Sequence, residues 1–323
     1  MVSNLNAVVL SVVVPCYNEE QSLDDLFTRL ISVLNSLHLT YEIICIDDGS
    51  RDNTLKRLIE YHRANSAIKV VNFSRNFGKE IALTAGIEYA RGEAIIPIDA
   101  DLQDPPELIK DLILKWQEGY DVVYAKRRSR RGESWLKRKT ASAFYRTIGK
   151  MSPVPIPSDT GDFRLMDRRV VEALKLLPER HRFMKGLFAW VGFKQTAIEY
   201  DRPPRFQGET KWNYWQLWNF ALDGITSFSS LPLKVWSYIG LLISVLAFLY
   251  ATFLILRTLI FGIDVPGYAS IMVVTLFLGG VQLVSLGVIG EYLSRVHDEV
   301  KRRPLYIVRD CYGFEKEANQ HQK

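Results

Sequence analysis

Two long apolar runs near the carboxyl end constrain this chain more than any other feature of its sequence. Arg257 is the one charged residue between 235 and 261, and the stretch 265–290 has none. Each run exceeds the roughly 20 apolar residues that an α-helix needs to cross a bilayer. Because the link between the runs is very short, they predict a helical hairpin in a membrane. Two buried core helices are the alternative.

The basic residues around the hairpin predict its orientation. The link at 262–264 has no Lys or Arg, whereas both outer flanks are basic, at Lys234, Arg295, Lys301, Arg302 and Arg303. Basic residues accumulate on the cytoplasmic side of membrane proteins. We therefore expect two spans, with both termini and everything before the hairpin in the cytoplasm.

The first 125 residues alternate between strand-like and helix-like segments. The strand-like segments lie at 8–14, 41–46, 68–73, 93–98 and 121–125. Such alternation predicts an α/β domain with a mostly parallel sheet and helices on both faces. Ligands of these sheets bind beyond the carboxyl ends of the strands. The polar residues that follow each strand are therefore the candidates for a functional site.

Two later segments are typical of helices at a bilayer interface, because the first mixes aromatic with basic residues and the second is aromatic-rich and nearly uncharged. These segments lie at about 133–150 and 212–230, and the first overlaps a basic stretch at 126–139. Ordinary core helices with a solvated basic face are the alternative. The predicted organisation is a catalytic domain at 1–230, two membrane helices at 231–295 and a cytoplasmic tail at 296–323. A strand-like segment in the tail can pair with the sheet edge or with a neighbouring subunit.

Asp99 and Asp101, in the turn after the strand 93–98, are the most informative pair of residues. Carboxylates are hard oxygen ligands that suit Mg²⁺ or Mn²⁺. Such a metal would neutralise the charge that develops on a nucleoside diphosphate leaving group. A solvated turn is the alternative, because two acids in one turn are a weak signal by themselves.

Polar residues after the first two strands complete the predicted edge. Asp48 can accept a hydrogen bond from uracil or ribose, Tyr17 can stack on a base, and Glu19 can bind a sugar. The alternative is a turn that leads into a helix cap at Ser50 or Asp52. The sequence has no glycine-rich phosphate loop, which argues against a dinucleotide enzyme or a P-loop ATPase.

These motifs together carry a resemblance to a known family. The segments 15–20, 47–54 and 99–103 resemble the nucleotide-binding half of the inverting family 2 glycosyltransferases, which have the GT-A fold. The segments 158–165 and 205–211, with the two-helix anchor, are similar to the polyprenyl-phosphate glycosyltransferases. That group includes dolichol-phosphate mannose synthase, and its bacterial bactoprenol (undecaprenyl-phosphate) glucosyltransferases look closest. The resemblance covers nearly the whole chain.

The resemblance implies a role for each matching residue. It assigns Pro15, Tyr17, Glu19 and Asp48 to the uridine, Asp99, Asp101 and Gln103 to the metal and diphosphate, and Arg205 and Lys211 to the donor phosphate. It assigns Arg127, with Lys137 or Arg138, to the acceptor phosphate, and contacts to anionic lipid are the alternative for these bases. Asp162 matches the proposed catalytic base, and Arg164 either positions it or contacts phosphate. Since a phosphate monoester is already largely a dianion at pH 7, the role of Asp162 stays open.

The resemblance also implies an activity, which is transfer of a sugar from a UDP-sugar to polyprenyl phosphate in the bacterial inner membrane. It favours glucose, with mannose or amino-arabinose as alternatives. A processive polysaccharide synthase is a second alternative, but the sequence lacks its Q-x-x-R-W segment. An inactive scaffold and a lipid-linked-sugar flippase are the non-enzyme alternatives. The expected cofactor is Mg²⁺ (or Mn²⁺). No nucleic-acid partner is expected, and the oligomeric state is left open, with a homo-oligomer as one option.

Overall fold

The structure is a computed structural model that describes residues 9–128, 160–180, 182, 184–201, 231–261 and 267–314. The chain divides into two compact units. The first unit comprises Met1–Asn219 together with Arg303–Lys323, and the second comprises Phe220–Arg302. The predicted interfacial segments at 133–150 and 212–230 lie outside the described residues.

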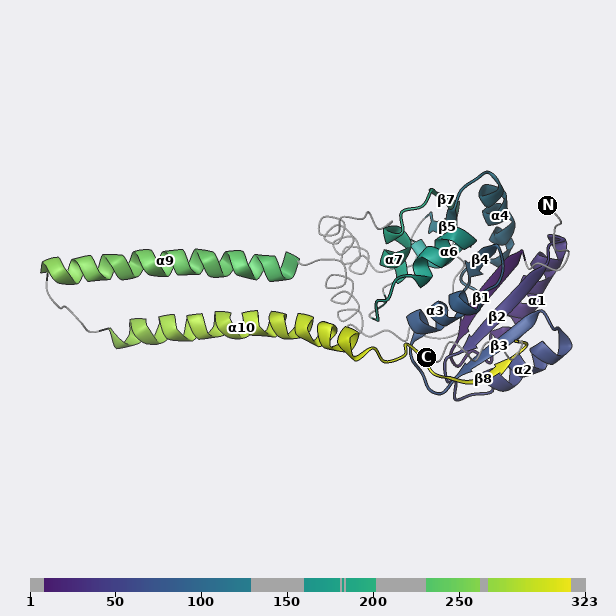
Figure 1. The fold of residues 1–323 in the computed structure, drawn as a ribbon, viewed down its shortest axis with the longest axis horizontal. Coiled ribbons are helices and arrows are strands. Elements are labelled where there is room, and N and C mark those ends of the chain that lie inside the picture. Colours follow the sequence, from purple (N-terminus) through teal and green to yellow (C-terminus); the bar gives the residue numbers. More distant parts are fainter. Residues whose placement is uncertain are drawn as a thin grey trace. The chain divides into compact units, whose positions relative to one another are not determined.

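An eight-stranded sheet forms the centre of the first unit, in the order β7-β5-β6-β4-β1-β2-β3-β8 (Figure 1). The strands are β1 (Leu10–Cys16), β2 (Tyr41–Asp47), β3 (Ile68–Phe73), β4 (Ala94–Pro97), β5 (Val122–Arg127), β6 (Thr160–Asp167), β7 (Gln195–Tyr200) and β8 (Val308–Tyr312). Strands β4, β1, β2 and β3 are parallel neighbours, as are β5 and β7. Strand β6 is antiparallel to both β4 and β5, and β8 is antiparallel to β3. The predicted mostly parallel sheet is confirmed.

Helices connect the strands of this sheet. They are α1 (Leu23–Ser36), α2 (Thr54–Ala64), α3 (Lys79–Tyr89), the 3₁₀ turn η1 (Pro106–Leu108), α4 (Ile109–Gln117), α6 (Arg168–Lys175) and α7 (Met184–Trp190). Helix α1 buries Leu23, Leu26 and Leu30, whose spacing makes one apolar face. Helix α3 approaches β1 so closely that a Cβ on Gly86 would lie 2.1 Å from Val13 Cγ1. Only glycine allows this contact.

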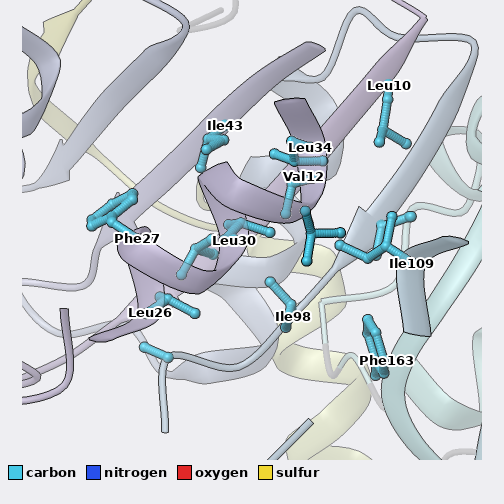
Figure 2. Packing of buried hydrophobic residues seen from close by; sticks show 14 of the residues in the cluster. Leu10, Val12, Leu26, Phe27, Leu30, Leu34, Ile43, Ile98, Ile109 and Phe163 are labelled. Atoms are coloured by element: carbon cyan, nitrogen blue, oxygen red, sulfur yellow. The ribbon is translucent and has the colours of Figure 1, made fainter. Parts of the chain in front are cut away.

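The hydrophobic core lies between α1 and the sheet, where the labelled side chains of Figure 2 point toward one another. Val12 on β1 and Ile43 on β2 are fully buried against Leu30 of α1. Burying a side chain of this size stabilises the fold by about 1.5–3 kcal/mol. Strand β1 is buried on both faces, as its continuous run of valines predicts.

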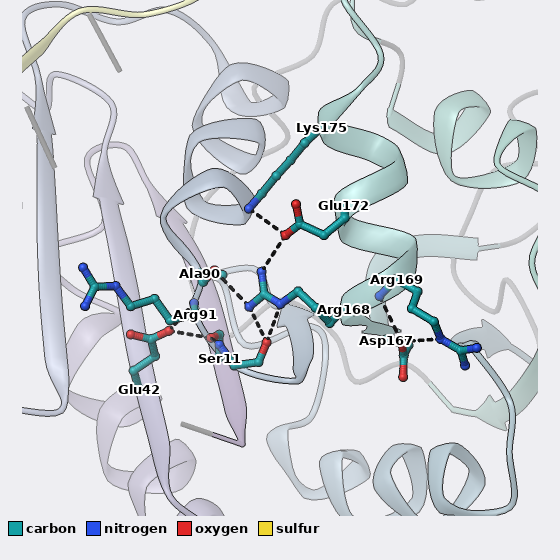
Figure 3. A network of polar contacts seen from close by, with 10 residues as sticks. Ser11, Glu42, Ala90, Arg91, Asp167, Arg168, Arg169, Glu172 and Lys175 are labelled. Atoms are coloured by element: carbon teal, nitrogen blue, oxygen red, sulfur yellow. Dashed lines mark hydrogen bonds and ion pairs between the residues drawn. The ribbon is translucent and has the colours of Figure 1, made fainter. Parts of the chain in front are cut away.

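A polar network stabilises the amino-terminal edge of the same sheet (Figure 3). The carboxylate of Glu42 is buried, accepts hydrogen bonds from the Ser11 hydroxyl (2.6 Å) and the Arg91 main chain (2.7 Å), and pairs with Lys69 (2.7 Å). Arg168 donates hydrogen bonds to carbonyl oxygens of the turn between α3 and β4. Because Glu42 is paired on several sides, these contacts offset the desolvation cost of burying its charge.

The second unit contains two long helices, α9 (Leu231–Phe261) and α10 (Tyr268–Lys301). Within the described residues, both are long and apolar enough to cross a membrane, over Tyr238–Phe261 and Ser270–Lys301. Many of their large apolar side chains are exposed, among them Leu241 and Phe248. Such surfaces are unfavourable in water, so these helices indicate membrane association.

The tail after α10 forms the last strand of the sheet. Strand β8 pairs with β3 in the register Val70↔Tyr312, and so occupies the sheet edge of its own chain. Just before β8, the ring of Tyr306 stacks on Phe73 with centroids 4.9 Å apart, and its hydroxyl donates a 2.6 Å hydrogen bond to Glu88. Of the two partners that the sequence left open, the structure shows the sheet edge.

We predict that Tyr306→Ala lowers the free energy of unfolding by about 2 kcal/mol, because it removes both the ring stack and the hydrogen bond to Glu88. Ile307→Ala is the matched control, since the Ile307 side chain is exposed. Denaturant unfolding of the detergent-solubilised full chain, followed by circular dichroism, measures both effects. Equal losses for the two variants would contradict a specific anchoring role for Tyr306.

Candidate functional site

The polar loops that follow β1, β2 and β4 leave the same edge of the sheet, because these three strands are parallel neighbours. The first two loops are joined at their start, where the Asp48 main chain donates a 2.9 Å hydrogen bond to the Cys16 carbonyl. The carboxyl-terminal edge that the sequence singled out therefore collects the candidate residues of three loops. This edge is the candidate active site.

Hydrogen bonds fix the loop that carries Tyr17 and Glu19. The Asn18 main chain donates to the Ser50 hydroxyl (3.0 Å), and the Glu19 main chain donates to the Thr54 hydroxyl (2.8 Å). Asn18 adopts a left-handed backbone with φ 54°, which asparagine tolerates better than most residues. Tyr17 and Glu19, which follow Pro15 at the end of β1, are therefore held by the neighbouring loop.

Ser50 and Asp52, which were expected to cap α2, lie before its N-cap position. The residue at the N-cap position is Asn53, so the expectation of Ser50 or Asp52 there is wrong. The Ser50 hydroxyl accepts the Asn18 hydrogen bond, and Asp52 accepts one from Thr54 (3.0 Å). The Ser50 side chain therefore joins the loop after β2 to the loop after β1, and the Asp52 side chain binds the start of α2.

Asp48 is buried and supports the loop before α3. Its two carboxylate oxygens accept main-chain hydrogen bonds from Phe77 (2.6 Å) and Gly78 (2.9 Å). Burial raises the pKa of Asp48, and these two hydrogen bonds oppose that shift. Each oxygen can accept a further hydrogen bond, so the predicted contact with uridine is compatible with this geometry and stays a prediction.

Asp47, the last residue of β2, is a candidate that sequence reasoning missed. Its side chain is buried, and its Oδ1 has no hydrogen-bond partner among the described residues. Burial raises the pKa of this carboxyl group. An unpaired buried acceptor is costly, which makes Asp47 a second acceptor for a ligand at this edge. Its position next to the candidate residue Asp48 could have identified it from the sequence.

Asp99, Asp101 and Gln103 lie in one tight turn after β4. The Gln103 main chain donates a 3.1 Å hydrogen bond to Asp101 Oδ1. Between them, the buried Leu102 has a φ of 58°. A left-handed leucine costs roughly 1–2 kcal/mol, and such strain persists where the surrounding structure imposes it. The turn that bears the predicted metal ligands is therefore held in a fixed conformation.

Lys79 links this turn to Asp162, and sequence reasoning missed it. Lys79 is the first residue of α3, and its ammonium lies 2.6 Å from Asp99 Oδ1 and 2.9 Å from Asp162 Oδ2. The structure thus brings Asp99 and the predicted catalytic Asp162 to one cation. Its position could have identified it as a candidate, since Lys79 follows the loop at the carboxyl end of the third parallel strand.

The charges around Asp162 determine what it can do. Burial alone would raise the pKa of Asp162, but Lys79 and then Lys185 hold that pKa well below its ordinary value. Burial raises the pKa of the neighbouring Glu80 to about 7, and the charge of Asp162 contributes to this shift. Asp162 therefore stays ionised at neutral pH and is a weak proton acceptor. A fixed negative charge is the role that its surroundings favour.

Arg164 and Arg127 lie on β6 and β5, beside Asp162. Arg164 is buried, its guanidinium stacks on the Phe188 ring at 4.0 Å, and it donates a 2.8 Å hydrogen bond to the Gly161 carbonyl. This packing favours a positioning role for Arg164, one of the two that the sequence left open. Arg127 is half-buried, and its Nε has no hydrogen-bond partner among the described residues. Lys137, Arg138, Arg205 and Lys211 lie outside the described residues.

The turn at 99–103 fits a divalent metal by the chemistry of its donors. Two carboxylates and an amide oxygen are hard ligands of the kind that Mg²⁺ and Mn²⁺ bind. Within the part of the chain that the structure describes, no group of three or more His, Cys, Asp and Glu side chains is suited to a metal. Water and substrate phosphate would have to complete the shell, as is common for magnesium.

Comparisons with known proteins agree with this architecture. Residues 11–175 match Glycosyl transferase family 2, and residues 231–296 match the GtrB C-terminal hairpin. An uncharacterized glycosyltransferase of Synechocystis sp. is 68% identical over 306 residues, which cover 95% of this chain and 96% of the relative. A prophage bactoprenol glucosyl transferase homolog of Escherichia coli K12 is 49% identical, covering 93% and 98%. The bactoprenol glucosyl transferase of Shigella phage SfII is also 49% identical, covering 94% and 98%.

Proposed function

Because the chain belongs to glycosyl transferase family 2, we propose that it transfers a sugar from a UDP-sugar to polyprenyl phosphate and releases UDP. The observation that carries this proposal is similarity over nearly the full length of bactoprenol glucosyl transferases, hairpin included. We propose glucose as the sugar and undecaprenyl phosphate as the acceptor. The arrangement of charges at the candidate site supports the proposal.

The donor would bind at the edge formed by the first three loops. Tyr17, Glu19 and Asp48 would hold the uridine, and Asp99 and Asp101 with Gln103 would hold Mg²⁺ or Mn²⁺ beside the diphosphate. When bound, the metal would act as a Lewis acid that neutralises charge on the leaving group. The strained turn at Leu102 supports this assignment, because it keeps the donor atoms oriented before the substrate arrives.

The acceptor would attack in a single displacement. A phosphate oxygen of the acceptor forms a bond to the anomeric carbon, while the bond from that carbon to UDP breaks and UDP takes the electron pair. The acceptor is already largely a dianion at neutral pH, so this step needs little help from a base. The ionised Asp162, aligned by Lys79, would stabilise positive charge on the sugar ring. Inversion would give a β-linked product.

The hairpin would anchor this chemistry at the cytoplasmic face of the inner membrane. The acceptor has a long hydrocarbon tail, so its phosphate is confined to the headgroup region. An enzyme that is bound to the same membrane meets this phosphate at high effective concentration. The uncharged link and basic flanks of the two helices support the proposed orientation.

Purified full-length protein, undecaprenyl phosphate, Mg²⁺ and a panel of labelled nucleotide sugars test the activity. We expect a glucosyl lipid from UDP-glucose, resolved by chromatography. Asp101→Ala should abolish its formation, because the metal loses a ligand where leaving-group charge develops. Asp111→Ala, at an exposed position of α4, is the control and should retain activity. Failure to form a lipid product from any donor would contradict the proposed function, as would full activity of Asp101→Ala.

Variants of two neighbouring arginines test which residues bind the acceptor and which bind the donor. We expect Arg127→Ala to lower kcat/KM for undecaprenyl phosphate by about tenfold to a hundredfold, the value of one charge-assisted phosphate contact. Arg128→Ala should cost little, because Arg128 is exposed and pairs with Asp201 (3.4 Å). Initial rates against each substrate measure both effects. If Arg127→Ala instead weakens UDP binding and spares the acceptor, the assignment of Arg127 is wrong.

Single cysteine substitutions test the proposed orientation of the hairpin in the membrane. In a background that lacks Cys16, Cys45 and Cys311, Gly262→Cys should react with a membrane-impermeant thiol reagent added to intact spheroplasts. Arg309→Cys, exposed on β8, should react only after the membrane is opened. The opposite labelling pattern would reverse the proposed topology.

A further inference from the structure

The ammonium of Lys79 contacts the carboxylate of Asp99, which is one of the proposed metal ligands. It lies 2.6 Å and 2.7 Å from the two oxygens of Asp99, so both oxygens of that carboxylate already contact a cation. The same ammonium lies 2.9 Å from Asp162. The Asp99 side chain is 22% exposed and the Lys79 side chain is 46% exposed, so solvent only partly screens this ion pair.

The local fold places Lys79 at this position. Lys79 follows Gly78, whose φ of 101° is unfavourable for residues with a side chain. The Gly78 and Phe77 main chains both donate hydrogen bonds to the buried Asp48. The guanidinium of Arg75 lies over the Phe77 ring at 4.0 Å, which further orders the loop. The start of α3 is therefore attached to the loop after β2.

This attachment joins two parts of the candidate site. Asp48 belongs to the proposed nucleoside contacts, and Asp99 belongs to the proposed metal contacts. Lys79 contacts Asp99 directly and is one residue from the Asp48 hydrogen bonds. One short segment therefore connects the proposed nucleoside contacts with the proposed metal contacts.

We propose that Lys79 is a positioning residue that competes with the divalent cation for Asp99 and so makes cation binding depend on the nucleoside diphosphate. Without the nucleotide, a cation at Asp99 must displace or approach the ammonium, and the two positive charges repel each other. The diphosphate brings negative charge that offsets this repulsion, while Asp162 remains a partner for the ammonium. This inference rests on the proposed donor, a nucleoside diphosphate sugar.

The proposal predicts a thermodynamic coupling. If UDP strengthens the binding of Mn²⁺, then Mn²⁺ strengthens the binding of UDP by the same factor. In the wild type this factor is large, because Lys79 weakens the binding of the metal alone. Removing the charge of Lys79 should strengthen binding of the metal alone and reduce the factor.

Free Mn²⁺ measured by electron paramagnetic resonance, with the full-length protein in detergent, tests this coupling. We expect Lys79→Met to lower the Kd for Mn²⁺ alone by about tenfold, and to reduce the strengthening by UDP by a similar factor. Lys79→Arg keeps the charge and should stay close to the wild type. Lys115→Met removes an exposed lysine that pairs with Glu118 on its own helix end, and should change neither value.

Two results would overturn the proposal. Unchanged or weaker binding of Mn²⁺ alone by Lys79→Met would show that Lys79 does not compete with the metal. Equal effects of Lys79→Met and Lys79→Arg would show that the shape of the side chain matters and its charge does not. The arm without nucleotide tests Lys79 independently of the transferase activity, whereas absence of UDP binding by the wild type would contradict the proposed function instead.

Discussion

The shared direction of β4, β1, β2 and β3 is the constraint on which the rest of the first unit depends. Parallel pairing brings the loops after these strands to one edge, although the loops are far apart in sequence. It also requires both faces of the sheet to be covered. The close approach of α3 at Gly86 meets this requirement on one side, and it determines where Lys79, at the start of the same helix, meets Asp99.

Two carboxyl groups of the candidate site have opposite electrostatic environments. Two carboxyl groups lie close together, and their surroundings shift their pKa values in opposite directions, with Asp162 lowered and Glu80 raised to about 7. A lysine paired to the first group keeps it charged, whereas burial favours the neutral form of the second. The ionised Asp162 suits the role of a fixed charge, whereas a carboxyl group with a pKa near 7, such as Glu80, can gain or lose a proton at neutral pH.

Much of this architecture is predictable from the sequence, and the reasons are local. Continuous β-branched runs such as 10–14 specify buried parallel strands, and the two apolar runs specify the hairpin that the family comparison confirms. The α/β class follows from the order of these elements, whereas the GT-A fold was implied by the resemblance to the family 2 glycosyltransferases. The candidate residues after the strands were also predictable, because a short stretch of sequence shows where an apolar strand ends and polar residues begin.

The residues that sequence reasoning missed depend on contacts between distant segments. Lys79 and Asp162 are brought together only by the antiparallel insertion of β6 beside β4, which no periodicity reveals. The unpaired oxygen of Asp47 is likewise a property of the assembled core. Asp48 shows a different limit, because its type and position were recognised while its hydrogen bonds to the α3 loop were not.

The origin of β8 has a consequence for how the protein is made. Asn72 and Asp310, whose side chains form a hydrogen bond across the last strand pair, are 238 residues apart in sequence. At about 5–20 residues per second, the ribosome needs roughly 12–50 s to pass from β3 to β8. During that interval the edge of β3 has no partner strand from this chain, and open edges are prone to pair with other chains. Because both hairpin helices are synthesised before β8, the sheet can be completed only after the hairpin has been made.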